Sequence, residues 1–457
     1  MIAPVSASIS AKFRVKVRAA ITALMGKIFV ILLSLLLLPG AALALPSSVK
    51  VNLFQAHSDI NSLVVDGAFE ISQAGQSGSA SGAGSSTLRH AEISLSKNGL
   101  LLKTGPGRHA GAASASASTK SGRRVGTRIV IRAVGAQPLY LQPDTLVASR
   151  PGIASNLNSS AGSNSSSNSG RRYRGRIFVT ASGGKLNVVN EVDTRSYITS
   201  VVGSESLPEF PLEALKAQSV LASTVLARQR PNMQLSDTTN VQAYLGSDYE
   251  RPLVKQAVAA VFGQKLETSS GTTPAVFYHS TCAGGTSDER EVFSGKLLND
   301  AARKPVSRCR TATRVKCKYC QDSPFFKAHR VQVSADELRR KVGYVPLTID
   351  VKDAEDRPLS LSVEKVNRAG GDSKTVSISG YDLWLKLGQG LGWGAVPGMR
   401  YAIEPGPIVT ITSTGAGHGA GLCQWGACGM AKAGKNYKEI LHYYFPLAQV
   451  SAQTPAK

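Results

Sequence analysis

Short runs that alternate between apolar and polar residues dominate the chain up to about Ser200. They are rich in β-branched residues and end at turn-forming residues, as β-strands do. Three tracts of Ser, Gly, Ala and Asn separate them, and such tracts bury too little surface to order themselves, so we interpret them as flexible insertions. The predicted strands are Val49–Phe54, Ser62–Val65, Ile93–Leu95, Arg128–Val134, Ile177–Ala181 and Lys185–Val189, and the insertions are Ala74–Ser86, Ala110–Ser121 and Ala154–Gly170.

Helical spacing replaces this alternation beyond Tyr197. Pro211 suits the first turn of a helix, and the apolar residues that follow it recur on one face. The pattern predicts helices over Leu212–Gln229, Leu253–Phe262 and Tyr437–Tyr444 and a buried strand over Ala275–Tyr278. We therefore expect an α+β protein with a β-rich N-terminal region at 46–170 and a mixed α/β domain at 171–450.

The first 45 residues have the composition of an export signal. Residues 12–27 carry five basic side chains and no acid, and the apolar run Ile28–Leu38 precedes Ala42-Leu43-Ala44. A basic segment, a short apolar segment and an A-x-A site are typical of a secretory signal peptide. Ile28–Leu45 also has about the minimum length for a membrane-spanning helix, so an uncleaved anchor stays open. In both cases we expect export to the periplasm or cell wall, with membrane contact only through this segment.

The composition of the 457 residues narrows the class of partner. A hydrophobic content of 42% excludes global disorder, and 53 Lys and Arg against 30 Asp and Glu give a formal net charge of +23. This excess predicts an anionic partner: nucleic acid, an anionic membrane or an acidic polymer outside the cell. Export disfavours nucleic acid, and no base-stacking or groove-reading motif accompanies the basic runs.

Three segments concentrate residues that can do chemistry. Val201–Pro208 places Glu205 in a loop ahead of the long helix, where a lone carboxylate also serves as a solvated residue or a helix cap. His279–Gly285 follows the apolar strand and precedes a C-x-x-C motif at Cys317–Cys320. Gly417–Ala427 surrounds a His, a Gln and a Trp with glycines, which indicates backbone held close to a ligand or a simple Gly-rich turn.

Together these segments resemble the SpoIID/LytB family, named for stage II sporulation protein D, and they occur in the family's order. The matching phrases are YITSVVGSESLPEFPLEALKAQ from Tyr197, FYHSTCAGGT from Phe277 and GAGHGAGLCQWGACGMA from Gly415. The resemblance implies a peptidoglycan lytic transglycosylase that acts on glycan strands stripped of stem peptides. It covers most of the chain outside the insertions.

The family's essential acid falls on Glu205. As a general acid it would protonate the oxygen between N-acetylmuramic acid and N-acetylglucosamine. The sugar's own C6 hydroxyl would close on the cationic centre and return a proton to the carboxylate, leaving a 1,6-anhydro end. Because no water is consumed, the second carboxylate of ordinary glycosidases is not required. A nearby helix N-terminus would keep Glu205 ionised, whereas an acid catalyst needs a raised pKa.

The resemblance also implies substrate contacts near this acid. Lys216 takes the place of the family's helix lysine, which would bind the lactyl carboxylate of muramic acid; taken alone it is a solvated helix lysine. Ser223 stands where the family has an arginine near the substrate, a departure that weakens the expected affinity. The implied substrate-binding residues are Lys216, Gln218, Ser280, Gly284, Gly285, His418, Gln424 and Trp425.

The six cysteines, all beyond residue 280, leave two interpretations open. H-x-x-C followed by C-x-x-C predicts a structural Zn²⁺ site made of His279, Cys282, Cys317 and Cys320, and some members of the family carry zinc at the H-x-x-C segment. In an oxidising compartment the same cysteines, with Cys309, would form disulfides instead. The two-residue spacing favours zinc. The two remaining cysteines, Cys423 and Cys428, are either paired or free.

Two other functions compete with the transglycosylase. The first is a LytB-like wall protein that binds glycan without cleaving it and stimulates a cell-wall amidase; Glu205 argues against it and Ser223 for it. The second is a basic binder of anionic wall polymers, supported by Arg303–Lys318 and by the arginines at 171, 172, 174 and 176. The expected partners are thus peptidoglycan glycan strands and, for the LytB-like alternative, a cell-wall amidase, with no nucleic acid.

Overall fold

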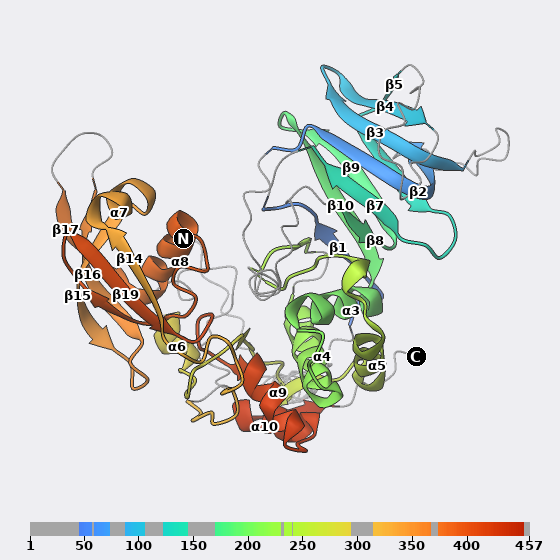
Figure 1. Ribbon diagram of the computed structural model, residues 1–457. Coiled ribbons are helices and arrows are strands. Elements are labelled where there is room, and N and C mark those ends of the chain that lie inside the picture. Colours follow the sequence, from blue (N-terminus) through green and yellow to red (C-terminus); the bar gives the residue numbers. More distant parts are fainter. Residues whose placement is uncertain are drawn as a thin grey trace, which may run out of the picture. The chain divides into compact units, whose positions relative to one another are not determined.

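The computed structural model (Figure 1) describes residues 45–56, 59–73, 87–105, 122–144, 170–229, 233–239, 241–293, 314–366 and 373–451. The export segment up to Ala44, the three predicted insertions apart from Gly170, and Cys309 lie outside these residues. The helices and strands named below belong to one unit, which spans 44–269 and 273–457. No helix in the described ranges is long and apolar enough to cross a membrane.

A large antiparallel sheet holds most of the first half of the described chain. Its strand order is β11-β1-β10-β9-β6-β2-β3-β4-β5, and β7 joins β2 to β8. Among the described strands of this sheet, only β1 and β11 pair in parallel. The strands are β1 (Ser48–Asn52), β2 (Ser62–Gln73), β3 (Leu88–Ser96), β4 (Gly99–Gly105), β5 (Arg123–Val125), β6 (Arg128–Ala133), β7 (Leu139–Pro143), β8 (Arg171–Tyr173), β9 (Arg176–Ser182), β10 (Lys185–Asp193) and β11 (Leu235–Ser236).

The hairpin of β9 and β10 shows why these residues form strands. Buried and less buried side chains alternate along β10, so that Leu186, Val188 and Val192 face the core. The connection is Gly183-Gly184, and both residues have positive φ angles, 60° and 76°. A two-residue turn with positive φ at both positions matches the twist of the strands, and glycine adopts it at little cost. All six predicted strands overlap strands of the structure.

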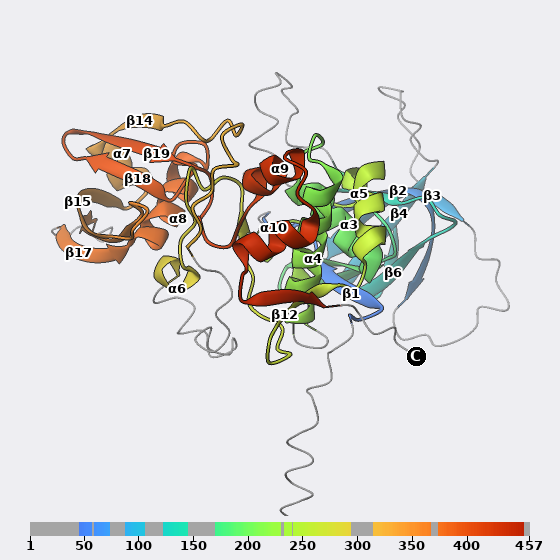
Figure 2. The ribbon, with the colours of Figure 1, turned by 90° about the horizontal axis from the view of Figure 1, so that it is seen from below.

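A group of helices packs beside the sheet, with α4 (Leu212–Ala227) contacting the four others (Figure 2). Asp193 caps the first helix by accepting a hydrogen bond from Ser196 N, and prolines open the next two. The other helices are α3 (Thr194–Glu205), α5 (Pro252–Val261), α9 (Gln424–Lys432) and α10 (Tyr437–Tyr444), with a short 3₁₀ turn η2 (Ser247–Tyr249). Two small ladders join the middle of the chain to its C-terminal part: β12 (Lys265–Thr268) pairs with β21 (Ala448–Ser451), and β13 (Tyr278–His279) pairs in parallel with β20 (Leu422–Cys423).

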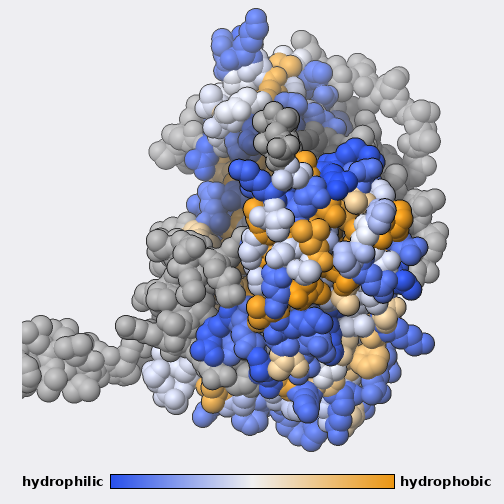
Figure 3. Space-filling view, turned by 90° about the vertical axis from the view of Figure 1, so that its left-hand side faces the viewer, coloured by the Kyte–Doolittle hydropathy of each residue, from blue (hydrophilic) through white to orange (hydrophobic). Residues whose placement is uncertain are grey.

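Residues 329–414 form a lobe with a second hydrophobic core, built around Leu361, Leu383 and Ile411. Two three-stranded antiparallel sheets and two helices enclose it. These are β14 (His329–Ser334), β18 (Arg400–Glu404) and β19 (Ile408–Thr414); β15 (Tyr344–Lys352), β16 (Pro358–Lys365) and β17 (Lys374–Ser379); and α7 (Ala335–Lys341) and α8 (Gly380–Leu391), while the short α6 (Glu289–Val292) precedes the lobe. On the face drawn in Figure 3, hydrophilic residues surround a band of apolar residues.

The predicted α+β class is confirmed. The long helix, the second helix and the last helix are confirmed as α4, α5 and α10, and the last has the predicted bounds. The strand predicted over Ala275–Tyr278 is wrong in extent, because only Tyr278 and His279 pair, with β20. The division at residue 170 stays a prediction; the large sheet includes strands from both sides of it.

Gly203 permits the close approach of α3 to η2. A Cβ atom at this position would overlap the carbonyl oxygen of Tyr249. We expect Gly203→Ala to lower the free energy of unfolding by about 1–3 kcal/mol, because backbone must move to relieve the overlap. Urea denaturation measures the change. Gly126→Ala is the control, since nothing lies within 4 Å of a Cβ there; equal effects of the two substitutions would contradict the argument.

Candidate functional site

Glu205 is the last residue of α3, so the predicted loop around it is wrong. Val201–Glu205 continue the helix, and Ser206 ends it with an extended backbone. The chain then turns through Pro208 before α4 begins. The carboxyl group therefore lies at a helix C-terminus, where the partial negative charge of the helix disfavours an ionised acid. This is the opposite of the helix N-terminus that the sequence pattern had indicated.

The Glu205 side chain is buried, with 5% of its surface exposed. Burial raises its pKa to about 7, although hydrogen bonds from the backbone of Ala243 and from Tyr278 act in the other direction. The Ala243 amide donates to Oε1 at 2.7 Å. At neutral pH this carboxyl group can both hold and release a proton, as a general acid and base must.

Tyr278 is a neighbour of the acid that sequence reasoning missed. Burial raises the pKa of its hydroxyl well above 10, so that the hydroxyl keeps its proton and can donate to Glu205. The same hydroxyl lies 3.5 Å from Oε1 of Gln242. Sequence reasoning could have found Tyr278, because it directly precedes His279 in the phrase that resembles the family. Ala243 contributes only its N–H group, and no side-chain pattern reveals that.

A shallow, partly open depression begins at Ser206, the residue after the acid. Gln424 lines it, and Gln424 Nε2 donates to the backbone oxygen of Glu205 at 2.9 Å. Trp425 lies edge-on to Phe210, one of the lining residues, with 5.5 Å between ring centroids. The lining residues are Ser206, Phe210, Ala214, Gln218, Leu422, Gln424 and Ala427. Two of the predicted substrate-binding residues, Gln218 and Gln424, are thus brought together beside Glu205.

Lys216 has a structural partner. Its Nζ lies 2.6 Å from Glu213 Oε1, and Glu213 Oε2 accepts a hydrogen bond from Tyr437 N at the start of α10. Ser223 is buried in α4, and the guanidinium of Arg228 donates to the carbonyl oxygen of Thr273. The role of Lys216 in binding a carboxylate stays a prediction, and such binding would compete with Glu213.

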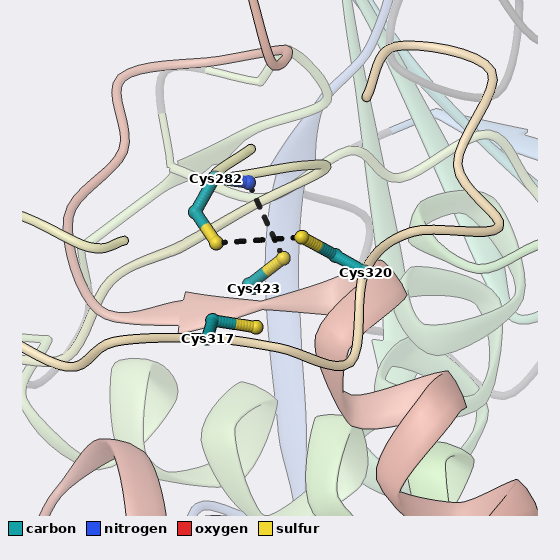
Figure 4. A group of neighbouring side chains, drawn as sticks. All are labelled: Cys282, Cys317, Cys320 and Cys423. Carbon is teal, nitrogen blue, oxygen red and sulfur yellow. Dashed lines mark hydrogen bonds between the residues drawn. The ribbon is translucent and has the colours of Figure 1, made fainter. Parts of the chain in front are cut away.

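Four buried thiols form the candidate metal centre (Figure 4). The sulfur atoms of Cys282, Cys317, Cys320 and Cys423 all lie within 4.8 Å of one another, and those of Cys282 and Cys320 are 3.7 Å apart. Tetrahedral thiolate ligands at about 2.3 Å from a zinc ion lie about 3.8 Å apart, whereas a disulfide needs about 2.05 Å. The four residues therefore fit a metal ion, and all five described cysteines have free thiols.

The structure differs from the predicted ligand set in one residue: Cys423 takes the place of His279. His279 Nδ1 lies 3.0 Å from the carbonyl oxygen of Ala420, and burial lowers the pKa of the ring well below 6.5, so the ring is neutral and donates there. Cys423 joins the thiols because β20 pairs with β13, next to the H-x-x-C segment. Its sulfur accepts hydrogen bonds from Cys282 N and, at the start of α9, from Gly426 N. Sequence spacing did not reveal it, because 103 positions separate Cys320 from Cys423.

A buried cation, Arg357, lies beside three of the remaining predicted or neighbouring residues, Gly285, Ser287 and Gly419. Arg357, 1% exposed, donates to the carbonyl oxygen of Gly285 at 2.5 Å and to Ser287 Oγ at 2.6 Å. A Cβ at Gly419 would overlap the Arg357 guanidinium. His418 packs against His279, with 5.7 Å between ring centroids, and burial lowers the pKa of His418 to about 4.

Ser280 and Gly284 act here through their backbones. The Ser280 carbonyl accepts from Trp425 N at 3.0 Å, and the Gly284 carbonyl accepts from Cys317 N at 2.8 Å. Both bonds join the H-x-x-C segment to its neighbours, so direct substrate contacts by these two residues stay predictions.

The arginine run that favoured a polymer binder is engaged in ion pairs. Its four members pair with different acids, at distances from 2.6 to 3.8 Å. The pairs are Arg171–Asp237, Arg172–Asp248, Arg174–Glu250 and Arg176–Glu191. These contacts hold β8 and β9 to their surroundings, which weakens the case for this run as a polymer-binding surface.

Comparison with known proteins finds relatives of this chain. The SpoIID family model, described as stage II sporulation protein, matches residues 182–267, which include Glu205 and α4. Stage II sporulation protein D of Bacillus subtilis is 29% identical over 284 residues, which cover 58% of this chain and 76% of that protein. The chain is therefore similar to the SpoIID family in this region.

Two further relatives extend the comparison. A Brachyspira hyodysenteriae protein whose name assigns no function is 28% identical over 285 residues, 60% of this chain and 71% of that protein. The amidase enhancer of Bacillus subtilis is 24% identical over 283 residues, which make up 54% of this chain and 39% of the enhancer.

The raised pKa of Glu205 predicts a pH-dependent stability. Between pH 4.5, the ordinary pKa, and about 7, the folded protein holds a proton that the unfolded chain releases. The stability that this group contributes is complete below pH 4.5 and is lost as the pH rises through 7. In Glu205→Gln the group does not titrate. Relative to the variant, we expect the wild type to lose about 3 kcal/mol of unfolding free energy between pH 4.5 and pH 8.

Urea denaturation of both proteins at the two pH values measures this difference. Glu209→Gln is the matched control, because Glu209 is an exposed glutamate four residues further on. Parallel pH profiles of wild type and Glu205→Gln would contradict the assignment.

Proposed function

We propose that this protein is an exported peptidoglycan lytic transglycosylase that cleaves bonds between N-acetylmuramic acid and N-acetylglucosamine. The observation that carries the proposal is the buried carboxyl group of Glu205, whose pKa is raised to about 7 at the C-terminus of α3. The match to the SpoIID family covers this residue and supports the proposal.

The reaction needs one carboxyl group in two protonation states. Protonated Glu205 donates its proton to the glycosidic oxygen, and the bond from that oxygen to C1 of muramic acid breaks with the electron pair on oxygen. The C6 hydroxyl of the same sugar attacks C1, and the Glu205 carboxylate takes the hydroxyl proton. The products are a free 4-hydroxyl on one sugar and a 1,6-anhydro end on the other, and the acid is regenerated without water.

The neighbours of Glu205 suit both halves of this cycle. Burial and the helix C-terminus favour the protonated acid before the first transfer. The Ala243 amide and the Tyr278 hydroxyl then stabilise the carboxylate that the transfer creates. Peptide-free glycan, with one lactyl carboxylate per disaccharide, also suits the net charge of +23. Access to this glycan requires export, for which residues 1–45 are the proposed signal or anchor.

An amidase-stimulating wall protein is the second candidate function. The similarity to the Bacillus subtilis amidase enhancer and the serine at position 223 favour it. In that case the same glycan would bind without cleavage, and a cell-wall amidase would be the partner. We rank this function below the transglycosylase, because Glu205 lies in an environment that suits a general acid.

Digestion of purified peptide-free glycan strands decides between the two functions. We expect mass spectrometry to find 1,6-anhydro-muramyl ends with the wild type. Glu205→Gln should reduce their rate of formation at least about 100-fold, because the amide cannot donate the proton. Glu209→Gln should leave the rate unchanged. Cleavage that survives in Glu205→Gln would overturn the mechanism, and an inactive wild type that still binds the strands would favour the amidase-stimulating function.

We further propose that the four thiols hold a structural Zn²⁺. Four protein ligands fill a tetrahedral shell and leave no open position for substrate, so the ion would stabilise the fold and not take part in the reaction. Its position is informative, because Cys423 is followed directly by Gln424, which binds the Glu205 backbone. The ion would thereby fix the start of α9 against the end of α3.

Metal analysis of the purified protein tests this site. We expect about one zinc per chain, and a strong chelator should lower the melting temperature, because binding energy at such a site is folding energy. Cys282→Ser and Cys423→Ser should each lose the metal. Cys428→Ser is the control, since Cys428 is buried but lies outside the group of four. Disulfides among these cysteines in a metal-free, stable protein would overturn the zinc proposal.

A further inference from the structure

The hydroxyl of Tyr278 faces two hydrogen-bond acceptors at once. It lies 3.5 Å from Gln242 Oε1, which is long for a hydrogen bond, and it also bonds to the Glu205 carboxyl group. A tyrosine hydroxyl has one proton to donate, so a full bond to one acceptor weakens the bond to the other. The donor is therefore shared between the two oxygens.

Glu205 and Tyr278 both bind the short segment of residues 242–243. The Ala243 amide donates to Glu205 Oε1, and the side chain of the residue before it supplies the oxygen that faces Tyr278. Gln242 is only 1% exposed, and its Nε2 has no hydrogen bond of ordinary geometry among the described residues, although Tyr197 lies close to the amide. Burying such a donor costs free energy, so the presence of this glutamine needs an explanation.

We infer that the Tyr278 hydroxyl changes its acceptor with the protonation state of Glu205. While the carboxyl group holds its proton, the hydroxyl donates to Gln242 Oε1. Once the carboxyl group has released its proton, the hydroxyl donates to the carboxylate, which is the stronger acceptor. Tyr278 keeps its own proton throughout, because burial raises its pKa well above 10. Gln242 is a positioning residue, whose oxygen receives the hydroxyl while the acid is protonated.

The exchange of acceptors follows the proton of Glu205 during cleavage, a role that rests on the proposed function. When Glu205 gives its proton to the glycosidic oxygen, the Tyr278 hydroxyl turns from Gln242 to the new carboxylate. When the carboxylate takes the proton of the C6 hydroxyl, the Tyr278 hydroxyl returns to Gln242. Each protonation state of the acid thus has its own hydrogen-bond arrangement, and neither leaves the buried hydroxyl unpaired.

The other groups around the acid keep their charge while Glu205 titrates. From α3 itself Tyr197 faces the carboxyl group, and burial raises the pKa of Tyr197 above 10. At the start of α5, the permanently charged Arg251 donates to the backbone oxygen of the residue after Glu205 at 2.8 Å. His418 bonds to the Tyr278 backbone and has a pKa of about 4, so its ring is neutral near pH 7. The glutamines that α4 and α9 contribute beside the acid are uncharged.

The exchange predicts opposite shifts in the titration of Glu205. Gln242→Met removes the acceptor that serves the protonated state, so the pKa of Glu205 falls. Tyr278→Phe removes the donor that serves the carboxylate, so the pKa of Glu205 rises. We expect a shift of about 0.5–1 pH unit in each direction, the value of one hydrogen bond. Because the stability contributed by protonated Glu205 is lost as the pH rises through this pKa, the loss ends at lower pH in Gln242→Met and at higher pH in Tyr278→Phe.

Urea denaturation at a series of pH values measures both shifts. Each variant is compared with the same variant carrying Glu205→Gln, so that the difference reports the titration of Glu205 alone. A protein with both Gln242→Met and Tyr278→Phe should have the pKa of Tyr278→Phe, because Gln242 acts through the hydroxyl. Shifts in the same direction, no shifts, or additive shifts in the double variant would overturn the inference.

A second tyrosine–glutamine pair provides matched controls. Tyr437 donates its hydroxyl hydrogen bond to Gln264 Oε1 at 3.0 Å, and neither residue is among the groups that shift the pKa of Glu205. Gln264→Met and Tyr437→Phe should therefore leave the titration unchanged. If Gln242→Met does not fold, Gln242→Asn tests the same point, because its shorter side chain draws the oxygen away from the Tyr278 hydroxyl.

Cleavage of peptide-free glycan at the same pH values separates this inference from the proposed function. In Gln242→Met we expect kcat to fall off at lower pH than in the wild type, with KM unchanged, because less of the acid is protonated near pH 7. Opposite shifts in the stability profiles support the exchange even if the wild type cleaves no glycan, a result that would reject the proposed function alone. Normal cleavage without opposite shifts would reject the exchange and leave the transglycosylase intact.

Discussion

The short parallel pairing of β13 with β20 is the constraint on which the site depends. It joins residues 278–279 to residues 422–423, and three consequences follow from it. Cys423 reaches the thiols of the H-x-x-C and C-x-x-C segments, Gln424 reaches the backbone of Glu205, and Trp425 N bonds to Ser280. A two-residue ladder is too short to persist alone. The metal that we propose for the four thiols would supply a cross-link that holds it.

Burial sets the electrostatics of this region. The same low-polarity surroundings raise the pKa of Glu205 and lower those of His279 and His418, so each group is held toward its neutral form. Arg357 is the buried cation nearby, and it is compensated by the carboxylate of Asp353 and by carbonyl oxygens of the loop that carries Cys282. Among Glu205, His279, His418 and Arg357, Glu205 is the group whose pKa lies near neutral pH.

Much of the fold follows from local pattern. The alternation of apolar and polar residues predicted strands of the large sheet. Pro211 and the helical spacing after it predicted α4. The lobe at 329–414 was not anticipated, because its core forms from residues far apart in the sequence, from Val292 to Ala420. The exact extent of α3 was missed for a similar reason. Its last turn, Val202-Gly203-Ser204-Glu205, contains glycine and serine, which have low helix propensity, and packing against η2 decides its conformation.

The sequence by itself determined the candidates: the acid at Glu205, the H-x-x-C and C-x-x-C segments, and the Gly-rich stretch around Gln424. Each of these candidates could be recognised from its own short stretch of sequence. Tertiary structure alone decided which of them meet. It placed Glu205 at a helix C-terminus instead of near an N-terminus, put Cys423 in the thiol group in place of His279, and left Gln218 Nε2 without a hydrogen-bond partner in the described part of the chain. Burial and pairing between distant segments are properties of the whole fold, so no single stretch of sequence contains them.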